Sequence, residues 1–499
     1  MSTLAAIRPH RRSPCPRVLS PASVRLLAAV VAAALAACSS HTSSSTLPGV
    51  GPVTTVAVTP TSFTMAIGDT VRLTTVAYDK SSNIITTDTV HWSSSDSSVA
   101  TVSDSGVVRA LVAGTATITA KVDSISATSA ITVTLPSTKP LTSVTAVVSG
   151  FEHSCALVSG GSAYCWGSNA QGQLGNDSAN AVSPFPLPVS GGLSFVSLAA
   201  GYAHTCGLTS GGSAYCWGDN AQGELGNVTA TTMSGTPVAV AGGLSFAMLS
   251  AGYSHTCGVT TAGQAYCWGA NESGELGNGT VGQNTTTPAL VAGGLTFASV
   301  SAGGVFTCGV TTAGAGYCWG SGGYGVLGNG GTADSDVPVA VAGGLQLASI
   351  SAGVYHTCAL TTSGAAYCWG NSANGQLGTG FTSLGSATPL AVAGGNTFAS
   401  VTTGELSSCA ATAAGAVFCW GSGSFGALGN GSTTGSTTPQ PVASTQTLTS
   451  VSAGISFHAC SLSTNGTAYC WGYDDSGELG DGTAGGYSVT PQEVVVPNT

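Results

Sequence analysis

The chain has 499 residues, more than one ordinary domain needs, and only 6% of them are charged. All ten lysine and arginine residues lie at or before Lys139, whereas fourteen aspartate and glutamate residues follow it. Nucleic-acid binding depends on cations that displace counterions from phosphates, so this distribution argues against nucleic-acid and phosphate ligands after Lys139. Hydrophobic residues reach 43%, and aromatic residues recur at regular intervals, which excludes a disordered chain.

The N-terminus has the pattern of an export signal. Five arginines precede the apolar run 26–37, which is too short to span a bilayer permanently. The run ends in Leu-Ala-Ala before Cys38, and this resembles the lipobox at which bacteria attach lipid to a cysteine. The sequence therefore predicts a lipoprotein signal peptide over 1–37, then the lipidated Cys38 with a Ser/Thr-rich tether over 38–53. Ser39 after the cysteine favours the outer membrane or the cell surface within the cell envelope.

Residues 54–135 alternate with a period of two. In the stretch TATITAKV, alanine, isoleucine and valine alternate with threonine and lysine, which indicates strands with one buried face. The stretch VHWSSSDSSVATVSDSGVVRALVAGTATITAKV resembles the bacterial Ig-like group 2 family. The resemblance implies an Ig-like β-sandwich with Trp92 in its core, which in that family usually serves as a spacer or an adhesin segment.

After a short linker over 136–141, residues 142–497 form seven repeats. Cys-Trp-Gly recurs with a period of 51 residues, once 50, and each unit has room for four short strands. Periods of this size are typical of propeller blades or solenoid turns, and seven blades make a ring without exposed edges. The whole chain is therefore predicted to be all-β, an Ig-like β-sandwich followed by a seven-bladed β-propeller.

Fourteen cysteines of the repeats fall in pairs ten residues apart. In the third unit, a three-residue hairpin loop ending at Gly263 places Thr260 opposite Gln264. Counting back along both strands places Cys257 opposite Cys267, within reach of a disulfide. The same glycine in every unit predicts the same bridge seven times, with buried free thiols and metal ligands as the weaker alternatives: Cys155–Cys165, Cys206–Cys216, Cys257–Cys267, Cys308–Cys318, Cys358–Cys368, Cys409–Cys419 and Cys460–Cys470. An exported chain resides where such bridges persist.

The unit SAGYSHTCGVTTAGQAYCWGANESGELGNG resembles the regulator of chromosome condensation repeat. The resemblance covers all seven units and implies a seven-bladed propeller. Units four and six depart most, because Phe306 and Ser407 replace a histidine that the other units share. The family's eukaryotic namesake is a guanine-nucleotide exchange factor, but the export signal, the disulfide pattern and the missing cations argue against that activity here.

The recurring histidines and tryptophans are predicted to be structural, because catalysis needs one site and not several copies: His153, His204, His255, His356, His458, Trp166, Trp217, Trp268, Trp319, Trp369, Trp420 and Trp471. No GxSxG, HExxH or phosphate-binding loop motif is present. The sequence predicts no catalytic residue, no metal and no cofactor. The acidic stretch 473–478 lacks the full spacing of a calcium loop, so a solvated loop is the preferred interpretation.

The stretch after each Trp-Gly varies most among the units and is predicted to form a binding rim on one propeller face. Aromatic residues on exposed rims are common binding hot spots. The candidate residues are Asp219, Glu272, Tyr324, Phe425, Tyr473 and Asp474. These features predict a binding or scaffold protein, adhesin-like and held to the membrane by its lipid, which binds a protein or a surface glycan. Inhibition of an enzyme outside the cytoplasm is the alternative.

Overall fold

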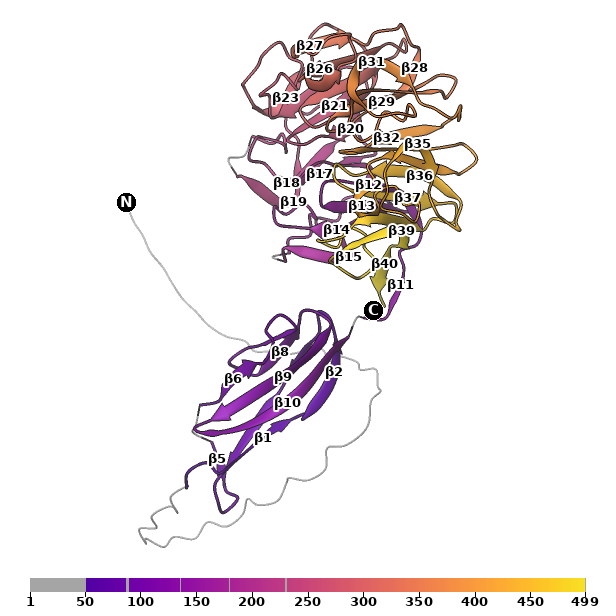
Figure 1. The fold of residues 1–499 in the computed structure, drawn as a ribbon. Helices are drawn as coiled ribbons and strands as arrows, with labels where there is room; N and C mark the ends of the chain where they lie inside the picture. The colour runs from indigo at the N-terminus through magenta and orange to yellow at the C-terminus, as the bar shows by residue number, and fades with distance from the viewer. Residues whose placement is uncertain (1–50, 87–88, 135, 179, 229–230, 499) are drawn as a thin grey trace, which may run out of the picture.

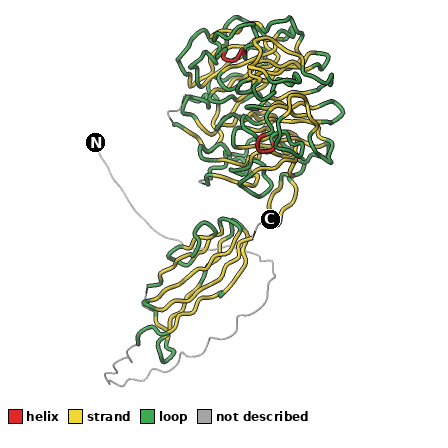
Figure 2. Tube along the Cα trace, in the orientation of Figure 1, coloured by secondary structure: helices red, strands yellow, loops and turns green. Residues whose placement is uncertain are grey.

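The computed structural model describes residues 51–498 apart from 87–88, 135, 179 and 229–230. The predicted signal peptide, Cys38 and most of the tether lie outside this part. Figure 1 shows an elongated β-sandwich and a larger ring of β-sheets. Helices in the described part are limited to two three-residue 3₁₀ turns, which Figure 2 shows in red, and neither approaches the length of a membrane span.

The first module is a small sandwich. Its sheets have the strand orders β1-β4-β5, β2-β10-β9-β6 and β3-β8-β7. The alternating pattern predicted strands with one buried face, and Ile118 and Ile131 accordingly lie in the core with Trp92 packed against it, itself only partly buried. Val53, assigned to the tether by sequence, is buried in this module. The strands are β1 (Thr55–Thr59), β2 (Ser62–Ala66), β3 (Thr70–Arg72), β4 (Thr74–Tyr78), β5 (Ile84–Ile85), β6 (His91–Ser94), β7 (Ala100–Val102), β8 (Val107–Ala110), β9 (Gly114–Val122) and β10 (Ile125–Thr134).

Seven four-stranded antiparallel sheets follow, and each is built from one sequence repeat. They are called blades 1 to 7 below. Blade 1 comprises β12 (Val144–Ser149), β13 (His153–Val158), β14 (Ala163–Ser168) and β15 (Val182–Pro188). Blade 2 comprises β16 (Phe195–Ala200), β17 (His204–Thr209), β18 (Ala214–Asp219) and β19 (Met233–Ala239). Blade 3 comprises β20 (Phe246–Ala251), β21 (His255–Thr260), β22 (Ala265–Gly269) and β23 (Thr285–Leu290).

The remaining blades repeat this order. Blade 4 comprises β24 (Phe297–Ala302), β25 (Phe306–Thr311), β26 (Gly316–Gly320) and β27 (Ser335–Ala340), with the turn η1 (Gly323–Gly325). Blade 5 comprises β28 (Leu347–Ala352), β29 (His356–Thr361), β30 (Ala366–Ser372) and β31 (Ser383–Ala391). Blade 6 comprises β32 (Ser400–Thr403), β33 (Ser407–Ala411), β34 (Val417–Gly421) and β35 (Ser436–Pro441), with the turn η2 (Ser424–Gly426). Blade 7 comprises β36 (Leu448–Ala453), β37 (His458–Ser463), β38 (Ala468–Tyr473) and β39 (Tyr487–Glu493).

The first strand of each blade contacts the first strand of its neighbours, so these strands lie innermost. The first strand of blade 7, β36, contacts β12 of blade 1, and the backbone N–H of Ile455 donates to the carbonyl of Gly150 at 3.0 Å. Part of the predicted linker forms β11 (Thr138–Pro140), which pairs with β40 (Val495–Pro497) near the C-terminus. The two ends of the repeat region are thereby joined.

Candidate binding face

Each blade contains a disulfide-bridged hairpin between its second and third strands. In blade 3, the backbone N–H of Thr260 donates to the carbonyl of Gln264 at 2.8 Å, and Gly263 turns the chain with φ of 80°. Cys257 then faces Cys267, as the sequence register predicts, with their Cα atoms 4.0 Å apart. All seven predicted pairs are bridged in the structure, and each of their cysteines is fully buried.

A buried hydrogen-bond cluster, called the latch below, joins neighbouring blades. At the junction of blades 1 and 2, the carbonyl of Gln173 accepts from the Thr205 hydroxyl and the Trp217 indole N–H, both at 2.9 Å. The Thr205 oxygen also lies 2.9 Å from Nε2 of His153. Because the single hydroxyl proton of Thr205 goes to the carbonyl, His153 must donate from Nε2, which leaves its Nδ1 unprotonated.

The same latch recurs between blades 2 and 3, 3 and 4, 5 and 6, and 7 and 1. Burial lowers the pKa of these histidines to about 3 or 4, with neighbouring histidines contributing for His153 and His204, so they are neutral at physiological pH. These histidines are buried and hydrogen-bonded to the neighbouring blade, which is consistent with the structural role that the sequence predicts for them.

Blades 4 and 6 lack this histidine. Phe306 replaces it in blade 4, and the hydroxyl of Thr357 in blade 5, which has no histidine partner there, still donates to the Val326 carbonyl at 3.0 Å. Ser407 replaces it in blade 6, and there the facing residue of blade 7 is Ala459, which has no hydroxyl. The Trp471 indole still donates to the carbonyl of Ala427, at 3.1 Å. The junction of blades 6 and 7 therefore has lost both side chains of the polar pair.

The loop after the third strand differs in the same two blades. In blade 2, the Glu224 carboxylate accepts the backbone N–H of Gln222 at 2.9 Å, and Asn220 bonds Leu225 and Thr231 across the loop. Burial raises the pKa of Glu224 to about 7, with a further contribution from Asp219. Blades 1, 3, 5 and 7 place a buried glutamine or glutamate at the same position: Gln173, Glu275, Gln376 and Glu478.

In blade 4, this loop carries Gly322 and Val326 where blade 2 has Asn220 and Glu224. The loop closes as the 3₁₀ turn η1, in which Tyr324 adopts the left-handed conformation at φ of 58°. A Cβ at Gly322 would lie 2.1 Å from the Ala333 carbonyl oxygen, so this path requires glycine. Blade 6 repeats the change with Gly423, Ala427 and a left-handed Phe425 in the turn η2.

The predicted rim residues differ in their exposure to solvent. Tyr324 is 57% exposed and Phe425 41%, Glu272 is exposed, and Asp219 and Tyr473 are partly buried. Asp474 was wrongly assigned to the rim, because it is only 3% exposed. It replaces the loop asparagine of blades 1 to 3, and its carboxylate accepts the backbone N–H of Leu479 at 3.0 Å. Burial, followed by the nearby Asp481 and Asp475, raises its pKa to about 7.

The loop between the first two strands supplies aromatic residues that the sequence analysis missed. Phe151 stacks on Tyr202, and Tyr202 stacks on Tyr253, with ring centroids 4.2 Å apart in both pairs. They belong to blades 1, 2 and 3 and occupy the same position, two residues before the latch histidine. The repeated aromatic residue at this position of the first three units is the sequence signal that marks these rings.

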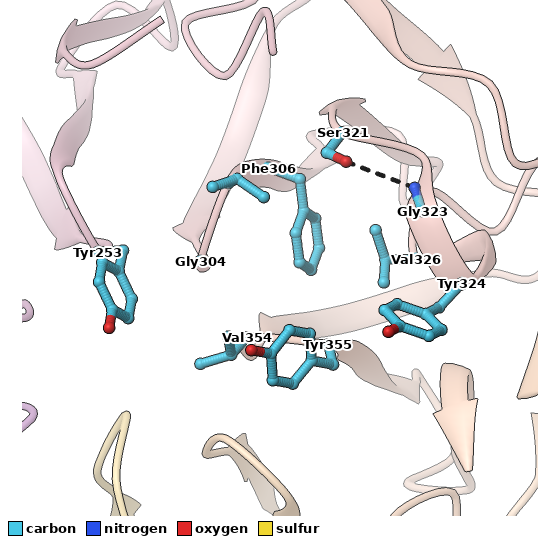
Figure 3. A pocket seen from close by; sticks show the side chains of 10 residues that line it. Tyr253, Gly304, Phe306, Ser321, Gly323, Tyr324, Val326, Val354 and Tyr355 are labelled. Carbon is cyan, nitrogen blue, oxygen red and sulfur yellow. Dashed lines mark hydrogen bonds between the residues drawn. The ribbon is translucent and has the colours of Figure 1, made fainter. Parts of the chain in front are cut away.

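A cavity of about 260 Å³ lies where blade 4 meets blade 5. The buried residues Phe306 and Val326 form its inner wall, and Figure 3 shows Tyr324 and Tyr355 close to them, with Tyr253 on the opposite side. The Tyr324 and Tyr355 rings meet edge to face at 5.9 Å between centroids. This cavity is called the blade 4 pocket below.

A second aromatic cluster lies at blades 6 and 7. The Phe425 ring lies 5.2 Å from that of Tyr473, 5.5 Å from that of Phe457 and 6.2 Å from that of Tyr487, measured between centroids. The Tyr473 hydroxyl donates to the carboxylate of Asp475. The structure thus places Phe425 and Tyr473 together and Tyr324 in a separate group. Both groups combine aromatic rings with neighbouring polar oxygens, which suits them to binding.

No three His, Cys, Asp or Glu side chains gather in the described residues in a way that could hold a metal ion. The acidic stretch 473–478 instead uses Asp474 and Glu478 to bond backbone N–H groups of its own loop.

Comparison with known families agrees with the architecture. Residues 186–499 match the RCC1-like domain, and residues 144–173 and 160–208 each match the regulator of chromosome condensation (RCC1) repeat. Residues 52–133 match the bacterial Ig-like domain (group 2). Both resemblances drawn from the sequence are confirmed.

Three known proteins illustrate the similarity. The ultraviolet-B receptor UVR8 of Arabidopsis thaliana is 34% identical over 202 residues, 40% of this chain and 46% of the receptor. The E3 ubiquitin-protein ligase HERC2 of Homo sapiens is 32% identical over 337 residues, 65% of this chain and 7% of the ligase. The crystal structure of Prp20p from Saccharomyces cerevisiae has a TM-score of 0.60 and 21% identity, covering 71% of this chain and 87% of that one. The chain spans less than half the length of these two sequence relatives, and the structural likeness shows the fold alone.

Proposed function

The chain belongs to the RCC1-like domain family. We propose that its propeller is a protein-interaction module that binds its partner through an aromatic face, which consists of the blade 4 pocket and the cluster of rings around Phe425. The crystal structure of Prp20p was described together with binding of that protein to Gsp1p and histones, which supports a protein partner for this propeller as well. A propeller of this kind acts by presenting a rigid surface, and no catalytic step is part of the proposal.

One observation carries this proposal. Exposed Tyr324 and Phe425 stand in the left-handed conformation, which is strained for residues other than glycine. The equivalent residues of the other blades are small or polar and have ordinary backbone conformations: Gln171, Gln222, Ser273, Asn374 and Ser476. Exposed aromatic side chains held at a conformational cost are expected of a binding surface.

We further propose that the protein is exported and lipid-anchored through Cys38, so that the sandwich and tether hold the propeller away from the membrane in an adhesin-like manner. Seven disulfides support this location, because such bridges persist in oxidising compartments. Labelling cells with radioactive palmitate tests the anchor: the wild-type chain incorporates label and Cys38→Ala does not. Equal labelling of both chains would refute lipidation at Cys38.

The partner is tested by photo-crosslinking in living cells. A photoreactive phenylalanine analogue replaces Tyr324, Phe425 or Tyr473, and adducts are identified by mass spectrometry. Leu290, half-exposed on the outer strand β23, gives the matched control position. One dominant protein adduct from the three face positions, absent from the Leu290 control, supports the proposal. No protein adduct from a folded, exported chain would refute it and direct attention to a surface glycan.

A soluble enzyme as the dominant adduct would select inhibition, the alternative function, over adhesion. The purified pair would then form a stoichiometric complex with reduced enzyme activity. A membrane or surface protein as the adduct would select the scaffold role.

A further inference from the structure

The blade 4 pocket results from a coordinated change of buried residues. At the positions where blade 2 buries His204, Asn220 and Glu224, blade 4 has Phe306, Gly322 and Val326. Phe306 and Val326 line a cavity of about 260 Å³ at this place. The cavity opens to the surface beside the exposed ring of Tyr324, so a group of a partner can enter it.

The size of the pocket points to a single side chain. Ligand pockets for small molecules typically enclose about 300–1,000 Å³, so this one lies below that range. Its back wall is apolar, formed by Phe306 and Val326 with Val354 alongside, and suits a hydrocarbon stem. Its mouth is lined by Tyr253, Tyr324 and Tyr355, whose rings attract a cation.

The charge around the pocket is negative. The propeller carries no lysine or arginine, because the last cation of the chain is Lys139. Glu405 of blade 6 lies next to the pocket, because the backbone N–H of the lining residue Val354 donates to the carbonyl of the adjacent Gly404 at 3.2 Å. Burial first, then Tyr202 and the Glu405 carboxylate, raise the pKa of the Tyr253 hydroxyl at the mouth. Glu405 is itself half-buried. A cation arriving at the mouth therefore meets aromatic rings and a carboxylate, with no cation of the propeller to repel it.

We propose that the blade 4 pocket binds an arginine or lysine side chain of the partner protein. The stem packs on the apolar back wall, and the charged head lies among the three tyrosines, close to Glu405. Long cationic side chains bury their methylene groups in this way while they keep their heads at a polar rim. The inference rests on the proposed function, since it names the side chain by which a protein partner engages the face.

The test uses the purified full chain with N-acetyl-arginine amide as the probe and N-acetyl-norleucine amide as its uncharged counterpart. The two probes share an apolar stem and differ in the cationic head. NMR spectra of the chain with isotope-labelled tyrosine rings report binding directly at Tyr253, Tyr324 and Tyr355. Saturable shifts of these rings are expected with the arginine probe, at an affinity at least about fivefold above that for the norleucine probe.

Two variants separate the contributions of the pocket. Glu405→Gln is expected to reduce the affinity for the arginine probe about fivefold and to leave that for norleucine unchanged, because only the charged head interacts with the carboxylate. Tyr324→Ala weakens binding of both probes. Asp104→Asn removes one negative charge from the exposed surface of the sandwich and controls for net charge, and Leu290→Ala controls for loss of an exposed apolar side chain; both should bind like wild type.

Equal affinity for the two probes, or an arginine affinity insensitive to Glu405→Gln, would overturn the inference. Absence of saturable ring shifts would overturn it as well. If the titration fails but crosslinking from Tyr324 still captures a partner, the proposed function stands and only the cationic side chain is wrong. If crosslinking also fails, the proposed function fails with it.

Discussion

Blades 1, 2, 3, 5 and 7 differ from blades 4 and 6 at the same places, although all seven come from one repeat. The first group, the regular blades, has a latch histidine and a buried glutamine or glutamate in the loop after the third strand. The second group, the variant blades, replaces both with residues that cannot make these bonds and adds an exposed aromatic residue in a left-handed turn. The exposed aromatic residues in left-handed turns thus stand only in the two described blades that lack the latch histidine.

The largest expected effect comes from breaking a latch between regular blades. Thr205→Val removes the hydroxyl that joins His153 to the Gln173 carbonyl. Because a buried donor then loses its acceptor, the free energy of unfolding should fall by about 2–3 kcal/mol. Denaturant titration followed by tryptophan fluorescence measures this. Thr205→Ser is the matched control, since Ser408 occupies the same position in blade 6, and it should lose under about 1 kcal/mol.

The buried loop carboxylates of the regular blades should make the free energy of unfolding depend on pH. Burial raises the pKa of Glu478 to about 8, ahead of contributions from Asp474 and Glu152, while the unfolded chain ionises near the ordinary value of 4.5. The unfolded state thus binds fewer protons between these two values, so stability is lost as pH rises from about 4.5 to about 8. Glu478→Gln should therefore stabilise the chain by about 2 kcal/mol at pH 9.

The same variant should have little effect below pH 4.5, where both states are protonated. Thermal unfolding of wild type and Glu478→Gln across this pH range provides the measurement. Gln376 shows that an amide fits the position, because its Oε1 accepts the backbone N–H of Asn374 at 2.9 Å. A gain that did not depend on pH would assign the effect to packing and not to ionisation.

At the junction of blades 6 and 7, two substitutions should raise the free energy of unfolding, by less than Thr205→Val lowers it. Ser407→His with Ala459→Thr would rebuild the latch there, with the Ala427 carbonyl as its acceptor. The double variant should be about 1 kcal/mol more stable than the sum of the single changes predicts, because each new group needs the other as partner. A double-mutant cycle in denaturant measures this coupling. Additive single effects would mean that the variant junction cannot accommodate the pair.

The pairing of strands within each blade could be predicted from the sequence more accurately than the contacts between blades or the exposure of the loop residues. The hairpin glycine at Gly263 sets the register that brings Cys257 to Cys267, since a hairpin loop fixes pairing locally. The partner of His153 lies in the next blade, 52 residues away, and only ring geometry brings them together. Asp474 was misplaced because its loop folds back on itself, so that a residue beside the exposed Asp475 points inward.

The smallest expected effect on stability concerns Tyr324. Tyr324→Gly removes an exposed ring but relieves a left-handed backbone, which glycine adopts without strain. The free energy of unfolding should therefore stay within about 1 kcal/mol of wild type, whereas binding of both probes at the blade 4 pocket should weaken. Ser273→Gly is the matched control, because Ser273 occupies the same loop position of blade 3 in an ordinary conformation. It should lose about 0.5–1 kcal/mol through chain entropy and leave binding intact. A larger loss for Tyr324→Gly than for Ser273→Gly would mean that the tyrosine stabilises its blade and is not held at a conformational cost for binding.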